Sequence, residues 1–364
     1  MRVLQVINDL DMAGAQALLI EVVRQLADHG VSSDVWALTR TGSRFEEALR
    51  TSGVALHGLS ERSVYSPAHV TALAKHLRRQ RYDLIHVHLF PAQLWTPLAV
   101  RLSKKVAPLV TTEHNTHNRR RKWYFRPLDQ WMYRHYQRII CISEATRDAL
   151  AQWMPLTAER LDVVWNGISP ERFQSAQGYQ KADVIGVEAP LVLSVGRLER
   201  QKDMQTLVRA VGALDGVHLA IVGDGAERPD LEALIDHERL RGRVHLLGRR
   251  SDVPQLLKTA DVYVQSSLWE GFGIAAVEAM AAGLPIIASR VPGLADVVGD
   301  AGILVEPGNS EVFAEQIQRV LLDETLRQTL AERAKKQAEL FSIERTVEGI
   351  LRVYECVISG KDLS

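Results

Sequence analysis

The sequence predicts an α/β protein built from two doubly wound parallel sheets in tandem. A chain of 364 residues is longer than one core usually organises, which favours two domains. Strand-like apolar runs alternate with segments whose apolar residues recur at helical spacing. The strand-like runs are rich in Val and Ile, as in parallel sheets covered by helices on both faces. This alternation stops once near the middle of the chain and then resumes.

The first half contains five strand-like runs separated by amphipathic segments such as 16–28 and 68–79. These runs are RVLQVI (2–7), DVWALT (34–39), LIHVHL (84–89), LVTTEH (109–114) and RIICIS (138–143). In doubly wound sheets, ligands bind beyond the carboxyl ends of the strands. We therefore expect functional residues at those ends, and we expect the two sheets to face each other across one cleft.

The alternation stops in a polar stretch, 166–184, that carries Pro170 and lacks clear periodicity. We interpret 1–168 as the first domain, 169–185 as a linker and 186–341 as the second domain. Strand-like runs resume as LVLSVG (191–196), HLAIVG (218–223), RVHLLG (243–248), DVYVQS (261–266) and PIIAS (285–289). From Ser310 onward the pattern predicts helices with charged faces.

The composition excludes several classes of protein. Forty-four basic and forty-four acidic residues cancel, so no global field favours nucleic acid. Cys141 and Cys356 are too few for a disulfide framework or a thiolate metal site. The N-terminus lacks a signal-peptide pattern, and no segment approaches the ~18 uninterrupted apolar residues of a spanning helix. We expect a cytoplasmic protein, with peripheral attachment to the inner face of a membrane left open.

The stretch SLWEGFGIAAVEAMAAGLPII (267–287) carries two carboxylates, Glu270 and Glu278, among small and apolar residues. Gly271 and Gly273 lie where a strand gives way to a helix, and such a junction presents backbone N–H groups that suit phosphate. Glu278 could accept both hydroxyls of a ribose, and Glu270 could accept hydroxyls of a second sugar. The alternative is structural: Glu270 caps the helix and Glu278 pairs with a buried arginine.

A second motif, SVGRLERQKDMQTL (194–207), places Arg197 and Lys202 after a strand. A fixed guanidinium and a mobile ammonium are complementary ligands for a diphosphate. If the diphosphate leaves during the reaction, such cations stabilise the transition state more than the ground state. The alternative is a solvated basic turn.

Three further patterns carry less information. NDLDMAGAQALLIEVV (8–23) places Gly14 in a strand-to-helix turn that could contact the same ligand. GDGAER (223–228) begins like a dinucleotide loop, but Arg228 replaces the third glycine, and the chain has no Walker pattern. His86 and His88 share one face of a strand, but a third metal ligand is not obvious. We interpret these histidines as inward-facing polar residues, with His88 at the border of the cleft.

The order of these motifs resembles the retaining glycosyltransferases of family 4, a large group with the GT-B fold. The resemblance includes GAQ (14–16), VGRL with a following lysine (195–202) and EGFGIAAVEAMAAGLPI (270–286), and it extends through LVTTEHN (109–115), IICISEATRDAL (139–150) and VVWNGI (163–168). It implies two facing Rossmann-like domains. It also implies that the final helix, about 342–364, packs back on the first domain.

Carried over to this sequence, the resemblance implies that Arg197 and Lys202 bind the donor diphosphate. Glu278 would hold the nucleotide ribose, and Glu270 would contact the transferred sugar. Donor contacts from the surrounding segment would come from Phe272, Gly273, Ile274 and Ala275.

Three residues outside the segments 194–207 and 267–287 complete the implied site. His114 matches a histidine that lies near the donor sugar in this family, so the implied catalytic set is Glu270, His114, Arg197 and Lys202. Arg249 lies where main chain contacts the nucleotide base, and Gly14 lies in the first-domain loop. The family usually has Gly-Gly-Ala in this loop, whereas this chain has Ala13-Gly14-Ala15, so the approach of the loop to its ligand could differ.

The implied activity is metal-independent transfer of a hexose-type sugar, with retention, from a nucleotide diphosphate sugar. No cofactor is implied; UDP-sugars are the favoured donors and GDP-sugars the next. The acceptor is expected to be a glycan or a polyprenyl-diphosphate-linked glycan in surface polysaccharide or glycoconjugate biosynthesis. The alternative is an inactive nucleotide-sugar binding or regulatory protein; an epimerase or a phosphorylase fits the motifs less well.

The segment 117–138, HNRRRKWYFRPLDQWMYRHYQR, combines basic and aromatic residues. Such a surface suits an anionic membrane interface and a lipid-diphosphate acceptor. Alternatively, it forms a helix whose aromatic residues face the core while its arginines face water.

Overall fold

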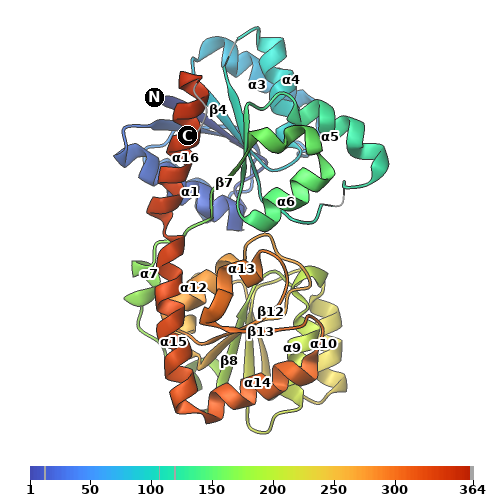
Figure 1. The fold of residues 1–364 in the computed structure, drawn as a ribbon, viewed down its shortest axis with the longest axis vertical. Coiled ribbons are helices and arrows are strands. Elements are labelled where there is room, and N and C mark those ends of the chain that lie inside the picture. Colours follow the sequence, from blue (N-terminus) through green and yellow to red (C-terminus); the bar gives the residue numbers. More distant parts are fainter. Residues whose placement is uncertain (12–13, 106, 119, 361–364) are drawn as a thin grey trace. The chain divides into compact units, whose positions relative to one another are not determined.

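The computed structural model describes residues 1–11, 14–105, 107–118 and 120–360. The chain divides into two compact units (Figure 1). The first comprises Met1–Gly167 together with Ile343–Ser364, and the second comprises Ile168–Ser342. None of the helices in the described part of the chain combines the length and the hydropathy that crossing a bilayer requires.

The first unit contains, within the described residues, a seven-stranded parallel sheet in the order β3-β2-β1-β4-β5-β6-β7. Its strands are β1 (Arg2–Ile7), β2 (Ser32–Thr39), β3 (Leu56–Ser60), β4 (Leu84–His88), β5 (Leu109–Glu113), β6 (Arg138–Cys141) and β7 (Leu161–Val163). Its helices are α1 (Gly14–Asp28), α2 (Arg44–Thr51), α3 (Ala68–Arg79), α4 (Ala92–Ser103), α5 (Arg126–Tyr133), α6 (Glu144–Trp153) and α16 (Ile343–Ser359), with 3-10 turns η1 (Trp123–Phe125) and η2 (Pro155–Arg160). The strand order reverses between β1 and β4, as in doubly wound folds.

The second unit contains a six-stranded parallel sheet, again counted over described residues, in the order β10-β9-β8-β11-β12-β13. Its strands are β8 (Leu191–Val195), β9 (His218–Val222), β10 (Val244–Gly248), β11 (Val262–Gln265), β12 (Ile286–Ser289) and β13 (Ile303–Val305). Its helices are α7 (Glu171–Gln174), α8 (Lys181–Ile185), α9 (Met204–Gly212), α10 (Arg228–His237), α11 (Val253–Thr259), α12 (Ile274–Ala282), α13 (Leu294–Val298), α14 (Ser310–Leu322) and α15 (Glu324–Ala338), with 3-10 turns η3 (Arg200–Lys202), η4 (Gly299–Ala301) and η5 (Glu339–Phe341).

These sheets confirm the predicted fold class of two doubly wound parallel sheets. Every residue of β4, β5, β9, β11 and β12 is buried, because helices cover both faces. Each of the ten predicted strand-like runs contains a strand. Three strands were not predicted: β3, β7 and β13. These strands lie at sheet edges and have three to five residues, too few for a clear periodic pattern.

The segment 169–185, which its polarity predicts to be a linker, is part of the second unit. It forms the short helices α7 and α8 and buries Phe173 and Ile185. Gly178 packs so closely that an added Cβ would lie 2.7 Å from the backbone oxygen of Lys258. The prediction of a linker missed these contacts because two apolar side chains in a polar stretch leave no periodic signal.

The C-terminal helix α16 belongs to the first unit. It covers one face of the sheet together with α1, and the two helices lie side by side in Figure 1. Val347, Ile350 and Tyr354 pack in a cluster with residues of α1 and of the central strands. Gly349 allows a close approach, since a Cβ at this position would lie 2.7 Å from Val164 Cγ1.

Candidate active site

The turn after β8 brings Lys202 to the carboxyl end of the second sheet. Gly196 leaves room for the lysine stem, because a Cβ at this position would lie 3.2 Å from Lys202 Cε. Lys202 ends the 3-10 turn η3, and Asp203, with φ of +46°, leads into helix α9. The lysine side chain is 16% exposed, so most of its stem is packed against protein.

Two glycines of the GDGAER motif support this turn. A Cβ at Gly223, where φ is +140°, would lie 1.9 Å from the Gly196 oxygen, and a Cβ at Gly225 would lie 2.3 Å from the Leu198 oxygen. The backbones are joined by hydrogen bonds from Gly196 N to Val222 O and from Leu198 N to Asp224 O. The motif therefore positions the turn that carries Arg197 and Lys202, a role that its sequence did not indicate.

Lys202 and Glu270 form a close ion pair. The Nζ of Lys202 donates to Oε2 of Glu270 at 2.7 Å, and both side chains are largely buried. The pair forms because β8 and β11 are neighbours in the sheet, so their carboxyl ends lie together. Gln265 Nε2 and Ser267 Oγ also donate to Glu270 Oε2, at 3.2 and 3.0 Å. This set holds the carboxylate in one orientation.

Sequence reasoning missed these supporting donors. Gln265 and Ser267 are fully buried polar residues at the end of β11, and Gln201 Nε2 lies 3.4 Å from Glu270 Oε1. A signal was available: Gln265, Ser266 and Ser267 follow the apolar residues of β11 and lie three to five residues before the carboxylate. Buried amides and hydroxyls need hydrogen-bond partners, and a nearby carboxylate supplies one.

Helix α12 begins directly beyond Glu270. Gly273 occupies the N-cap position with φ of +98°, so its backbone conformation favours glycine. Ile274 and Ala275 start the helix, where N–H groups precede any partner within the helix. Phe272 is buried and contacts Phe341 edge to face, with ring centroids 5.4 Å apart. The junction thus offers oriented donors for an anion.

Glu278 lies in the second turn of α12 and is half-buried. Burial raises the pKa of its carboxyl to about 7, and the charge of Arg172 only partly opposes that rise. Among the described residues, no hydrogen bond or ion pair to Glu278 is seen. The buried arginine of the structural alternative is thus not found, because Arg172 is exposed. A half-buried carboxylate without such a partner is suited to bind a ligand that brings hydroxyl donors.

Two arginines predicted at the site, Arg197 and Arg249, are not seen in contact with the Lys202–Glu270 pair in the described part of the chain. The Arg197 side chain is 61% exposed, and its guanidinium pairs with Glu199 at 2.7 Å. Arg249 follows β10 at the edge of the sheet, just after Gly248 with φ of +66°. Both residues lie beyond carboxyl ends of strands, as expected, and the Arg197 guanidinium is engaged by Glu199.

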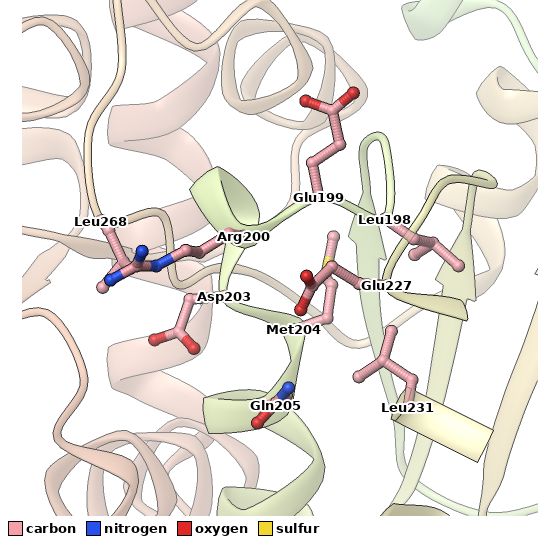
Figure 2. A pocket seen from close by; sticks show the side chains of 9 residues that line it. All are labelled: Leu198, Glu199, Arg200, Asp203, Met204, Gln205, Glu227, Leu231 and Leu268. Carbon is pink, nitrogen blue, oxygen red and sulfur yellow. The ribbon is translucent and has the colours of Figure 1, made fainter. Parts of the chain in front are cut away.

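A pocket of about 260 Å³ lies at the turn that leads into α9, and Figure 2 shows the side chains that line it. Its described lining residues are Leu198, Glu199, Arg200, Asp203, Met204, Gln205, Glu227, Leu231 and Leu268. None of the predicted site residues of the second unit is among them. Its charged side chains are three carboxylates and one guanidinium, a balance that disfavours a diphosphate in this pocket.

In the first unit, His114 follows β5 at the carboxyl end of the sheet. Burial lowers the pKa of its ring to about 4, and its Nε2 is inaccessible although the residue keeps some exposed surface. Gly14 begins helix α1 and is exposed. Ala13, the position at which the chain departs from the family pattern, lies outside the described residues.

The segment 117–138 combines both interpretations of its sequence. Met132, Tyr133 and Tyr136 are buried in the core, as the structural alternative expects. Trp123 and Tyr124, in contrast, are 83% and 51% exposed. The exposed pair lies in the 3-10 turn that precedes α5.

Metal ligation has no candidate within the described residues, since no group of three or more His, Cys, Asp or Glu side chains there could hold an ion. His86 and His88, the one pair considered from the sequence, are buried and hydrogen-bonded to neighbouring side chains.

Comparisons with known proteins identify the family of the chain. Residues 178–337 match the family described as "Glycosyl transferases group 1", and residues 12–172 match "Glycosyltransferase Family 4". The chain is 30% identical over 342 residues to a 2-deoxystreptamine glucosyltransferase of Streptomyces kanamyceticus, covering 86% of this chain and 87% of that protein. The chain belongs to glycosyltransferase family 4. The family predicted from the sequence is thereby confirmed.

Two further relatives extend the comparison. A UDP-Gal:alpha-D-GlcNAc-diphosphoundecaprenol alpha-1,3-galactosyltransferase of Escherichia coli is 28% identical over 309 residues, 80% of this chain and 79% of that protein. The crystal structure of Anabaena HepE in complex with UDP-glucose superposes with a TM-score of 0.86 at 23% identity, covering 99% of this chain and 100% of that one. At such identity the structural likeness shows the GT-B fold.

Proposed function

We propose that this glycosyltransferase moves a hexose-type sugar from a nucleotide diphosphate sugar to a glycan or lipid-linked glycan, with retention at the anomeric carbon. The observation that carries the proposal is the Lys202–Glu270 pair, which lies at the ends of β8 and β11 and directly before the N-terminus of α12. A cation, a carboxylate and free helix N–H groups at one junction provide what a diphosphate sugar requires.

Each group has a proposed role in binding the donor. Lys202, joined by Arg197 once it leaves Glu199, neutralises the diphosphate, and the N–H groups at Ile274 and Ala275 donate to it. Glu278 accepts from the ribose hydroxyls, and main chain at Arg249 contacts the base. Phe272 and Gly273 shape the junction. For two residues of the first unit, the family resemblance implies backbone contacts from Gly14 and a role at the transferred sugar for His114, and both roles belong to this proposal.

The proposed reaction is a same-face substitution. As the bond to the anomeric carbon breaks, negative charge grows on the leaving diphosphate, and Lys202 stabilises it more in the transition state than in the ground state. The leaving phosphate takes the proton of the attacking acceptor hydroxyl. Glu270, which is held by Lys202, Gln265 and Ser267, positions the sugar and forms no covalent bond. In this scheme protein cations supply the charge stabilisation that a metal ion would otherwise provide, and no cofactor takes part.

The relatives support a uridine donor and a lipid-linked acceptor. The named reaction of the Escherichia coli relative uses UDP-galactose and a diphosphoundecaprenol acceptor, and HepE was crystallised with UDP-glucose. The Streptomyces relative is named a 2-deoxystreptamine glucosyltransferase, so the names of the relatives point to different acceptors. We favour a UDP-sugar and a polyprenyl-diphosphate-linked glycan used in surface polysaccharide or glycoconjugate biosynthesis, with a GDP-sugar as the next candidate donor.

A lipid-linked acceptor implies work at the inner face of a membrane, and one surface of the first unit supports this. Exposed Trp123 and Tyr124 are flanked by exposed Lys122 and Arg126. Asp129, the acidic residue of the same helix start, is buried against Arg120 and Trp153. The surface therefore presents aromatic rings and positive charge, which is typical of segments that bind anionic bilayers.

The second candidate function is an inactive nucleotide-sugar binding protein, and one experiment separates the two. Release of UDP from a panel of UDP-sugars is measured with and without a lipid-linked glycan acceptor, in the parent protein and in Lys202→Ala and Glu270→Ala. We expect turnover in the parent and a loss of at least about 100-fold in each variant, with both variants folded. Near-parental rates in either variant refute its assigned role, and binding without turnover in the parent favours the inactive protein.

A further inference from the structure

One face of the first sheet carries buried polar side chains inside an otherwise apolar layer. The layer joins Val3, Leu84 and Val110 of the central strands to helices α1 and α16. Gln5, His86, His88 and Thr112 lie on this face, and each is at most 7% exposed. Burying such groups is costly unless they are hydrogen-bonded. Each of these groups therefore needs a hydrogen-bond partner within the layer.

Tyr354 of the C-terminal helix joins these groups into one chain of hydrogen bonds. Its hydroxyl lies 2.7 Å from His86 Nδ1 and receives a bond of 3.1 Å from Gln5 Nε2. His86 Nε2 is 2.7 Å from Thr112 Oγ1, and His88 Nε2 is 3.0 Å from Gln5 Oε1. The order is thus Thr112, His86, Tyr354, Gln5 and His88.

The direction of this chain decides which ring nitrogen of His88 carries the proton. Burial lowers the pKa of His86 to about 3 and that of His88 well below its usual value, so both rings are neutral and carry one proton each. With the Gln5 amide donating to Tyr354, its oxygen accepts from His88 Nε2–H, and His88 Nδ1 is left as an acceptor. Reversal of the Gln5 amide would reverse every bond and move the proton to Nδ1.

The free end of the chain lies beside His114. Within the described residues, His88 Nδ1 and His114 Nε2 are both buried without a hydrogen-bond partner. The two rings line the same small cavity, about 20 Å³, next to Ala15 at the carboxyl end of the sheet, and their centroids are 5.8 Å apart. That volume suits one hydroxyl or one water. A single such group can donate to His88 Nδ1 and accept from His114 Nε2–H.

We propose that Tyr354 and Gln5 are positioning residues, which hold His88 as a hydrogen-bond acceptor and thereby fix the tautomer and orientation of His114. The proposal rests on the proposed function in one respect, since there His114 acts on the transferred sugar. It also gives the C-terminal helix a chemical role in the first unit. Loss of the Tyr354 hydroxyl frees the Gln5 amide to rotate, so that His88 and then His114 populate both tautomers.

The test compares Tyr354→Phe with Tyr136→Phe. Both tyrosines are fully buried in the first unit, and each variant removes one hydroxyl; Tyr136 donates to the Gln93 backbone oxygen at 2.7 Å. The first readout is ¹⁵N NMR of histidine ring nitrogens without substrate, with His88 and His114 assigned from His88→Asn and His114→Asn. We expect one tautomer at each ring in the parent and in Tyr136→Phe, with the proton on Nε2. Tyr354→Phe should show mixed tautomers.

The second readout is kinetic. Tyr354→Phe should lower kcat about tenfold and leave the donor KM within about twofold, because His114 is misplaced while the donor site of the second unit is intact. Tyr136→Phe should keep the parental kcat. If Tyr354→Phe fails to fold, Gln5→Leu takes its place, because it removes the amide that joins Tyr354 to His88. It should give the same mixed tautomers and the same loss of kcat.

Unchanged tautomers in the folded variant overturn the proposal, as does an equal loss of kcat in Tyr136→Phe. Failure of the proposed function has a different signature, namely a parent protein that turns over no nucleotide sugar. The NMR comparison remains decisive in that case, because it needs no substrate.

Discussion

At the scale of single residues, Glu270 and Glu278 have contrasting surroundings. Glu270 accepts hydrogen bonds from Lys202, Gln265 and Ser267. Glu278 is half-buried, and burial raises the pKa of its carboxyl to about 7. A raised carboxyl pKa means that the folded protein binds the proton more tightly than the unfolded chain does. The ionised form of Glu278 therefore costs stability, and we infer that donor binding compensates for this cost.

Glu278→Gln should accordingly stabilise the ligand-free protein in a pH-dependent way. Below about pH 4.5 both side chains are neutral and the variant and parent should unfold alike. The advantage of the variant should grow as the pH rises through 7, to no more than about 3 kcal/mol. Thermal unfolding at pH 5 and pH 8 measures this difference, and UDP titrations should show weaker binding to the variant.

Glu270→Gln is the matched control and should be less stable than the parent, because the Lys202 ammonium loses its carboxylate. If Glu278→Gln and the parent unfold at the same temperature at pH 8, the inference that ionised Glu278 lowers the stability of the ligand-free protein is wrong.

The sequence predicted both members of the Lys202–Glu270 pair but not the pairing itself. The two residues are 68 positions apart, and they meet because β11 enters the sheet beside β8. Local patterns do not report strand order. Arg197 was predicted to bind with Lys202 but pairs with Glu199, because an exposed guanidinium takes a carboxylate two residues away. Which carboxylate an arginine pairs with depends on side-chain geometry, and the spacing of residues in the sequence does not show that geometry.

At the scale of elements, the turn 196–203 depends on glycines that lie elsewhere in the sequence. Gly223 permits a backbone contact with Gly196 that no other residue would allow, given its φ of +140° and the 1.9 Å separation of an added Cβ. The turn that carries Lys202 is therefore supported by the next strand of the sheet, β9.

Gly223→Ala should destabilise the second unit by at least about 2 kcal/mol and weaken UDP binding, since the turn must move. Gly242→Ala is a suitable control, because a Cβ there meets nothing within 4 Å. Urea unfolding and UDP titration of both variants check the expectation. Parental stability of Gly223→Ala would contradict this account of the turn.

The exposed turn η1 leads to an expectation about membranes. Trp123→Ala combined with Tyr124→Ala should reduce the fraction of protein that co-sediments with vesicles containing anionic lipid, and added salt should reduce it for the parent. Leu322→Ala removes a side chain of comparable exposure, 79%, from the second unit and should change nothing. Equal binding to neutral and anionic vesicles would end the membrane proposal.

Elements differ in how well the sequence predicts them. Strands buried on both faces, such as β4 and β5, are mostly apolar runs, so they can be predicted without knowing which strands lie beside them in the sheet. The edge strands β3, β7 and β13 are short, and α7 and α8 depend on single buried residues. For the segment 117–138 the sequence left two alternatives, an exposed aromatic surface and a helix whose aromatic residues face the core. Each describes one part of the segment, because Trp123 is exposed whereas Tyr133 is buried and donates to buried Glu113.

At the scale of the whole molecule, the chain forms two units of similar design, and its last helix returns to the first unit. That return could be expected only from the family resemblance, because the amphipathic pattern of 343–359 does not say which core it covers. In the structure, Val347, Ile350 and Tyr354 pack with α1 and the central strands. Tyr354 also reaches Gln5 and His86, which links the end of the chain to its beginning.

We propose that a nucleotide diphosphate sugar binds at Lys202, Glu270, Glu278 and the N-terminus of α12. A crystal structure of the protein with UDP would locate the nucleotide. We expect the diphosphate within hydrogen-bonding distance of Lys202 Nζ and of the Ile274 or Ala275 N–H, with ribose hydroxyls on the Glu278 carboxylate. Nucleotide bound instead in the pocket between Glu199, Asp203 and Glu227, away from Lys202 and Glu278, would contradict it.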